Sequence, residues 1–125
     1  ILTDSRSTPL RRGVTGYALA HHGFRPLRDY RGTRDIFGRK LRSSQSNVAD
    51  ALAGAAVLEM GEGNEQTPIA LITEVSDIRF LQRTPPPSDR EFTSLEVPLE
   101  EDLYWPLMKR APWKKPRPPA GRRPR

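Results

Sequence analysis

The sequence predicts an α+β fold: a mixed sheet with one long buried helix, extended ordered loops and a disordered basic tail. Three segments carry this prediction. Ser46–Met60 is alanine-rich and has the length of a helix, Gly13–Phe24 combines β-branched and aromatic residues with glycines, and Thr67–Val75 holds a continuous apolar run. The second pattern is typical of a strand with bends, and the third is typical of a buried strand.

The helix is the clearest of these elements. Ser46 is the candidate N-cap, Asp50 lies near the positive end of the helix dipole, and Gly61 is placed to end the helix. Apolar residues surround the segment on nearly all sides, since only one acid and one glycine interrupt its middle. We therefore expect Asn47–Met60 to be buried all round and packed on strands that include Ile69–Thr73.

Shorter segments complete the predicted fold. Ile1–Asp4 indicates the end of a strand that runs into a turn. Pro26–Leu41 mixes turn dipeptides with apolar residues, which favours a structured loop leading into a short strand. Residues 76–98 are polar and contain the break TPPPSD, so they indicate loop rather than core. Leu99–Met108 favours a short closing helix.

Composition narrows the class of protein. A chain of 125 residues has the length of one domain with a modest core. The absence of cysteine excludes disulfide scaffolds, thiolate catalysis and cysteine-based zinc sites. No apolar run approaches the roughly 18 residues that span a membrane, and no signal-peptide pattern opens the chain. We expect a soluble, cytoplasmic protein, and the start at Ile1 within a hydrophobic run suggests that a first strand began earlier.

The net charge of +6 comes from one end of the chain. Eight basic residues and no acid lie in 109–125, which leaves 13 basic and 15 acidic residues in 1–108. We expect 1–113 to form the domain and 114–125 to be a disordered Pro/Arg-rich tail. Such a tail can touch RNA, DNA or anionic lipid non-specifically, but solvated disorder is the expected state. The prediction is therefore no specific nucleic-acid partner and no membrane.

The stretch Glu59–Pro68, EMGEGNEQTP, has two possible explanations. It is a helix stop, because glycine tolerates positive φ just past a helix C-terminus. Alternatively it is a site for a metal ion and phosphates, built from glycine-loosened backbone and carboxylate oxygens. The stretch alone does not decide between them.

Other catalytic patterns are weak or missing. No Ser/His/Asp order, no Walker-type loop and no G-x-G-x-x-G after a strand is present. The adjacent His21 and His22 would point to opposite faces of a strand, so both cannot easily serve one ion. At least one of them is expected to have a structural or solvent-facing role.

Two oxygen-rich segments remain, Thr3–Ser5 and Gly61–Thr67. Carboxylates with hydroxyl and amide oxygens suit Mg²⁺ or Mn²⁺, hard ions that bridge phosphates. Several arginines could pair with phosphate or carboxylate, although a solvated surface is the ordinary explanation for them. These arginines are Arg6, Arg11, Arg12 and Arg39.

Three runs in order resemble one family: ILTDSRSTPLRRGVTGYAL, GFRPLRDYRGTRDIFGRKL and NVADALAGAAVLEMGEGNEQTPIALI. They resemble the C-terminal half of the coenzyme F-420:L-glutamate ligase family, most closely its bacterial branch described as folate-metabolism γ-glutamate ligases. The resemblance is collinear from Ile1 to about Trp113 and includes the closing segment LEEDLYWPLMKRAPW.

The resemblance implies an ATP- or GTP-dependent ligase that forms an amide with the amino group of L-glutamate. The second substrate would be a carboxylate acceptor, folate-like or a deazaflavin coenzyme, activated as an acyl phosphate. Mg²⁺ or Mn²⁺ would hold the nucleotide phosphates. The complete protein would be a homodimer.

The resemblance also implies which residues form the site. Asp4, Ser5 and Glu62 would bind metal. The nucleotide would be lined by Met60, Gly61, Gly63, Asn64, Glu65, Gln66 and Thr67. In this interpretation EMGEGNEQTP is both the helix stop and a wall of the site, with Gly61 and Gly63 letting backbone N–H groups approach phosphate.

Departures from the family pattern leave alternatives. The N-terminal half of the pattern, with another metal-binding Asp, has no counterpart here, and Ala20 with His21–His22 replaces a glycine and a small residue. We therefore expect a partial ligase that is inactive alone. The alternative is a non-catalytic remnant or interaction module that retains the fold, and a third possibility is RNA binding driven by residues 109–125.

Overall fold

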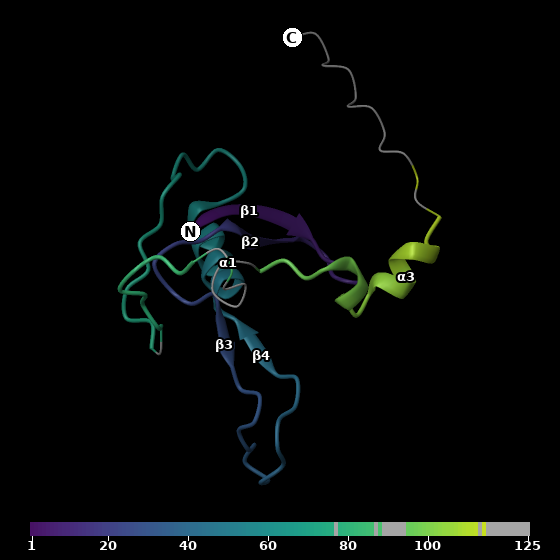
Figure 1. Ribbon diagram of the computed structural model, residues 1–125. Coiled ribbons are helices and arrows are strands. Elements are labelled where there is room, and N and C mark those ends of the chain that lie inside the picture. The colour runs from purple at the N-terminus through teal and green to yellow at the C-terminus, as the bar shows by residue number, and fades with distance from the viewer. Residues whose placement is uncertain (77, 87, 89–94, 113, 115–125) are drawn as a thin grey trace. The chain divides into compact units, whose positions relative to one another are not determined.

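The computed structural model describes residues 1–76, 78–86, 88, 95–112 and 114. The chain divides into two compact units, Ile1–Leu95 and Glu96–Arg125. The α+β class predicted from the sequence is confirmed, with strands that pair as two separate two-stranded antiparallel sheets (Figure 1). The predicted tail lies outside the described residues except for Lys114.

The first unit begins with an antiparallel pair of strands, β1 (Leu2–Ser7) and β2 (Val14–Ala20). Thr15 to Tyr17 of β2 stand opposite residues 4–6 of β1. The predicted turn after Asp4 is therefore wrong, because β1 continues through Ser7. Pairing with β2 keeps these polar residues extended, a long-range effect that their own sequence does not reveal.

Helix α1 (Val48–Met60) packs on β2 and begins one residue later than the predicted start at Asn47. Asn47, not Ser46, is the N-cap, and its side chain accepts a hydrogen bond of 3.0 Å from the Asp50 amide. Asp50 in turn accepts from the Ala18 amide at 2.8 Å, which ties the first turn of the helix to β2. Gly61 ends the helix as predicted, with φ of 81°.

The core of the first unit is small and lies between α1 and β2. Ala49 and Ala53 of the helix are fully buried. Gly16 of β2 permits the close approach, since a Cβ there would overlap the Ala53 carbonyl and the Val57 side chain. The other buried apolar residues are Ala18 and Phe24, and the partly buried apolar residues packed on this cluster are Val48, Leu52, Ile78 and Leu95.

The prediction that the helix is buried on all sides is wrong. Leu58 is 81% exposed, and Ile69 and Leu71 of the predicted strand are 86% and 88% exposed. Residues 67–75 form no strand, so they do not supply a layer beside α1. The physical reason is that a strand needs a neighbour for its backbone hydrogen bonds, and no other strand of the described chain pairs with this segment.

A hairpin extends from the N-terminal end of α1 (Figure 1). Its strands β3 (Leu27–Asp29) and β4 (Gln45–Asn47) are antiparallel. The connection between them is ordered by backbone hydrogen bonds, among them Gly32 N–H to Leu41 O at 2.9 Å. The predicted structured loop leading into a short strand is confirmed. Residues 27–47 are called the arm below.

The second unit contains a 3₁₀ helix, η1 (Leu99–Glu101), and a short helix, α3 (Trp105–Arg110). The predicted single helix over Leu99–Met108 is thus divided in two. Pro106 gives the reason, because proline has no N–H and fits only the first turn of a helix. Within the described residues, no helix is both long and apolar enough to cross a membrane.

Candidate functional site

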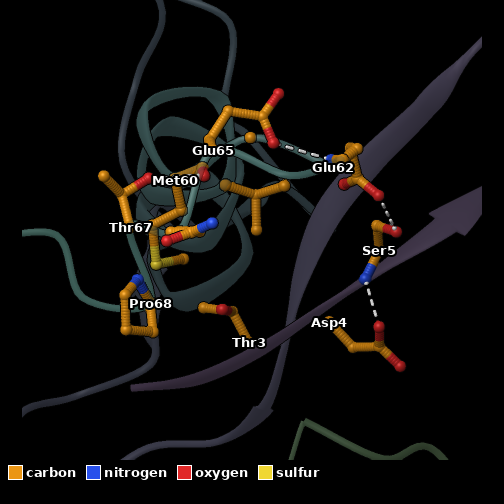
Figure 2. A pocket seen from close by; sticks show the side chains of 12 residues that line it. Thr3, Asp4, Ser5, Met60, Glu62, Glu65, Thr67 and Pro68 are labelled. Atoms are coloured by element: carbon orange, nitrogen blue, oxygen red, sulfur yellow. Dashed lines mark hydrogen bonds between the residues drawn. The ribbon is translucent and has the colours of Figure 1, made fainter.

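The loop that follows α1 lies against β1, and a hydrogen bond joins the two. The Ser5 hydroxyl donates to Glu62 Oε2 at 2.9 Å, although 57 residues separate them (Figure 2). Strand geometry explains the choice of side chain, because alternate residues of β1 face the same side. Thr3 and Ser5 are half-buried on one side, whereas Asp4 and Arg6 are exposed.

A pocket of about 630 Å³ opens at this junction. Nine of the ten predicted site residues line it, and the exception is Asn64, whose side chain accepts from Gln66 at 3.4 Å. Thr3, Val57 and Pro68 also line the pocket and were not predicted. Two of them had a signal in the sequence: Thr3 is one strand period before Ser5, and Val57 is one helical turn before Met60.

The loop Gly61–Thr67 is held by its own side chains. The Thr67 hydroxyl donates to the Met60 carbonyl at 2.7 Å, which closes the loop at its base. The Glu65 carboxylate accepts from the Gly63 amide at 2.7 Å. A Cβ at position 61 would overlap this carboxylate, which a movement of the Glu65 side chain can relieve, so glycine is favoured there mainly by its positive φ.

The two backbone amides that were expected to approach phosphate, those of Gly61 and Gly63, already donate hydrogen bonds within the protein. The Gly61 N–H donates to the Val57 carbonyl at 2.9 Å, as a helix C-cap does. The Gly63 N–H is held by Glu65. A phosphate oxygen could take the Gly63 amide only after the Glu65 side chain has moved.

The pocket is acidic. Asp4, Glu62 and Glu65 line it, and among the described residues no lysine, arginine or histidine does. A phosphate group would therefore meet carboxylates unless a cation lay between them. Carboxylate and hydroxyl oxygens are the donors that Mg²⁺ and Mn²⁺ prefer, so the chemistry of the donor set fits such an ion.

The three predicted metal ligands are not equivalent in position. Ser5 and Glu62 touch, but the Asp4 carboxylate accepts from the Ser5 backbone amide at 2.8 Å. Figure 2 shows this carboxylate on the far side of Ser5 from Glu62. Over the described ranges, no three His, Asp or Glu side chains are grouped to hold a metal ion. The metal site of Asp4, Ser5 and Glu62 stays a prediction.

The other candidate residues have partners away from the pocket. Arg6 lies 3.8 Å from the Asp50 carboxylate and 4.9 Å from the centre of the Tyr17 ring. Arg39 pairs with Asp35 at 3.0 Å. The His21 ring meets the Phe24 ring edge-on, with centroids 5.6 Å apart, which is a structural role of the kind expected for one of the histidines.

Comparison with known proteins matches the region that holds the pocket. A family model described as F420-0:Gamma-glutamyl ligase matches residues 1–74. Over 72 residues the chain is 40% identical to the coenzyme F420:L-glutamate ligase of Methanothermobacter thermautotrophicus, covering 58% of this chain and 29% of that protein.

Two more relatives of the same name give similar values. The Methanopyrus kandleri protein is 42% identical over 71 residues, which are 57% of this chain and 28% of the relative. The Methanocaldococcus jannaschii protein is 39% identical over 72 residues, which are 58% and 29%. The chain thus spans less than a third of the length of the curated relatives it matches. Every predicted site residue lies inside the matched region.

Proposed function

Because the chain belongs to the F420-0:Gamma-glutamyl ligase family, we propose that it forms part of a ligase that joins a carboxylate acceptor to the amino group of L-glutamate. The observation that carries the proposal is the acidic pocket in which Ser5 of β1 meets Glu62 beyond α1. This pocket lies wholly within the matched residues, and its donor chemistry suits the first step of such a reaction.

The proposed reaction begins with a nucleotide, ATP or GTP. Its terminal phosphoryl group passes to a carboxylate oxygen of the acceptor, which gives an acyl phosphate and a nucleoside diphosphate. The neutral amine of L-glutamate then attacks the acyl carbon, phosphate leaves with the oxygen that accepted it, and the amine loses a proton. The acceptor is proposed to be folate-like or a deazaflavin coenzyme.

The residues of the pocket would hold and orient the nucleotide phosphates. Ser5, Glu62 and Asp4 would hold Mg²⁺ or Mn²⁺, which supplies positive charge to the phosphates when bound. Glu62 also orients the Ser5 hydroxyl through their hydrogen bond. Met60, Thr67 and the glycines of the loop would line the nucleotide, with Gly63 offering its amide once Glu65 has moved.

Nucleotide binding tests this proposal on the full chain. Isothermal titration with GTP and with ATP, each in the presence of Mn²⁺, is expected to give binding that disappears when the metal is chelated. Glu62→Gln should weaken that binding on the order of 10-fold or more, in the range typical of groups that support a metal site. Glu100→Gln, a loss of the same charge in the second unit, is the matched control and should change nothing.

A non-catalytic remnant or interaction module is the second candidate. It is favoured by the position of the Asp4 carboxylate, which accepts from the Ser5 amide, whereas the Ser5 hydroxyl donates to Glu62. The partial-ligase proposal predicts that the chain alone binds nucleotide with Mn²⁺ but does not consume it with L-glutamate. Folded protein that binds neither nucleotide nor Mn²⁺ would instead support the remnant.

A further inference from the structure

A pocket beyond the C-terminal end of β2 is lined by both histidines of the chain. It has a volume of about 250 Å³ and is formed by two segments, residues 21–24 and 81–85. A continuous strand would turn His21 and His22 to opposite faces. Because β2 ends at Ala20, this alternation does not apply to them, and both histidines line the same pocket.

The two segments that form this pocket are fixed against each other. The Leu81 amide donates to the Gly23 carbonyl at 2.8 Å, and Phe24 forms an antiparallel bridge with Phe80. The buried Phe24 ring also meets the His21 ring edge-on. Because these walls are already held in place, a ligand that enters the pocket would lose little affinity to the ordering of the protein.

Every polar side chain that lines the pocket can donate a hydrogen bond. These side chains are two imidazoles, a guanidinium, an amide and a hydroxyl, from His21, His22, Arg83, Gln82 and Thr84. Among the described residues, no carboxylate lines the pocket and Arg83 has no ion-pair partner, whereas Arg31 and Arg39 pair with aspartates. Such a set of donors suits an oxyanion, because carboxylate and phosphate form strong hydrogen bonds with cationic donors.

An apolar groove of about 420 Å³ adjoins this pocket, and Phe24 lines both. The groove is also lined by Leu52, Ile72, Ile78 and Phe80, and by no charged side chain among the described residues. The pocket alone has the volume of about eight water molecules at about 30 Å³ each, more than a single inorganic ion fills. Pocket and groove together therefore suit an organic anion with an apolar body.

We propose that His21, His22 and Arg83 bind the oxyanion of an organic acid, a carboxylate or a phosphate, whose apolar body lies beside Phe24 in the adjoining groove. The guanidinium brings a permanent positive charge and a fork of N–H donors, and the imidazoles add further donors. Residues 81–85 lie beyond the part of the chain that the family model matches, so the match does not account for this site.

Electrostatics would orient such a ligand. The oxyanion pocket shares no lining residue with the acidic pocket, although the groove shares Thr3, Met60 and Pro68 with it. The carboxylates of the acidic pocket repel an anion, whereas the guanidinium of Arg83 attracts it. The anionic group is therefore expected at the histidines and the apolar body in the groove.

The histidines make this site directly observable, because every imidazole NMR signal of the chain comes from its two histidines. The full chain is titrated at constant pH with naphthyl phosphate, naphthoate, inorganic phosphate and naphthol. We expect saturable shifts of both imidazole signals with at least one aromatic anion. Its affinity should exceed those of inorganic phosphate and naphthol about 10-fold or more, because only the aromatic anion fills both the pocket and the groove. The tighter of the two aromatic anions identifies the acidic group.

Substitutions of exposed side chains separate the two parts of the site. Arg83→Gln and His22→Ala should each weaken the aromatic anion about 10-fold, because each removes a hydrogen bond to a charged group. Phe80→Ala should weaken the aromatic anion several-fold but leave inorganic phosphate unchanged, and Phe80 is 78% exposed, so the core stays intact. Arg12→Gln, which removes the same charge near the opposite end of the β1–β2 pair, is the matched control and should bind as the wild type does.

Circular dichroism confirms that each variant is folded before its affinity is compared. Equal affinity of the aromatic anions for wild type, Arg83→Gln and His22→Ala overturns the proposal. So does naphthol that binds as tightly as either aromatic anion, or an aromatic-anion affinity that Phe80→Ala leaves unchanged. The titrations contain neither nucleotide nor divalent metal, so their failure would leave the proposed ligase function standing.

Discussion

At the scale of single residues, Asp50 connects the first turn of α1 to β2. Its place in the first helical turn was predicted from the helix dipole. Its hydrogen bonds to the Ala18 amide and to the Asn47 side chain, both 2.8 Å, were not, because nothing in the sequence identifies a partner 32 residues away. One carboxylate thus holds the side chain of the N-cap residue Asn47 and attaches the helix to β2.

Asp50→Ala is expected to destabilise the first unit by about 1–3 kcal/mol, because it leaves a partly buried amide of β2 without an acceptor. Asp50→Asn keeps an oxygen for that amide and should lose clearly less. Urea unfolding followed by circular dichroism measures both. Equal losses for the two variants would mean that charge, not the hydrogen bond to Ala18, is what matters.

The carboxyl of Asp29 has a pKa that its neighbour Arg31 lowers. Hydrogen bonds from the Arg31 side chain and backbone lower the pKa of its carboxyl from 3.8 to about 2. A lowered pKa means that the pair stabilises the arm fully above the unfolded pKa of 3.8. That stabilisation is lost as the pH falls through about 2.

NMR titration of the Asp29 carboxyl carbon should therefore show a midpoint near 2, and Arg31→Gln should return it towards 3.8. Arg42→Gln, which removes the same charge elsewhere in the arm, is the control and should leave the midpoint nearly unchanged. A midpoint near 3.8 in the wild type would show that the Asp29–Arg31 pair does not form in solution.

At the scale of elements, the sequence predicts those features that depend on residues close together along the chain. The helix, its glycine stop and the β2 strand followed from composition and from residues within a turn of their ends. The strand predicted at Thr67–Val75 did not form, because its apolar run is only half of what a strand requires. A strand also needs a neighbouring backbone with which to form hydrogen bonds, and the residues of the segment do not indicate whether one is present.

Two glycines lie where α1 packs on β2, and only Gly16 is required for the close contact. Gly16 faces the helix backbone, whereas Gly54 has only ordinary contacts around the position of a Cβ. Gly16→Ala should therefore destabilise by about 1–3 kcal/mol through overpacking. Gly54→Ala should stabilise by about 0.5–1 kcal/mol, since alanine replaces glycine within a helix. Thermal unfolding that ranks the two variants in the reverse order would refute this packing.

At the scale of the whole molecule, the site is formed by two segments that are far apart in the sequence, so neither segment alone predicts it. Composition alone left the stretch after α1 open between a helix stop and a ligand site. Family resemblance paired it with the TDS segment, and the structure places Ser5 and Glu62 in hydrogen-bond contact. Asp4 lines the same pocket, but its carboxylate accepts from the Ser5 amide at 2.8 Å and is not joined to Glu62.

The proposed ligase chemistry requires that the pocket of Ser5 and Glu62 bind a divalent cation. The most direct measurement is an electron paramagnetic resonance titration of the full chain with Mn²⁺. We expect a saturable loss of the free-ion signal with one site per chain, and we expect Ser5→Ala and Glu62→Gln each to weaken the Mn²⁺ affinity about 10-fold or more. Ser44→Ala, which removes a hydroxyl from the arm, should bind as the wild type does. Mn²⁺ affinity that is equal in all four folded proteins would contradict the claim and leave EMGEGNEQTP as a helix stop.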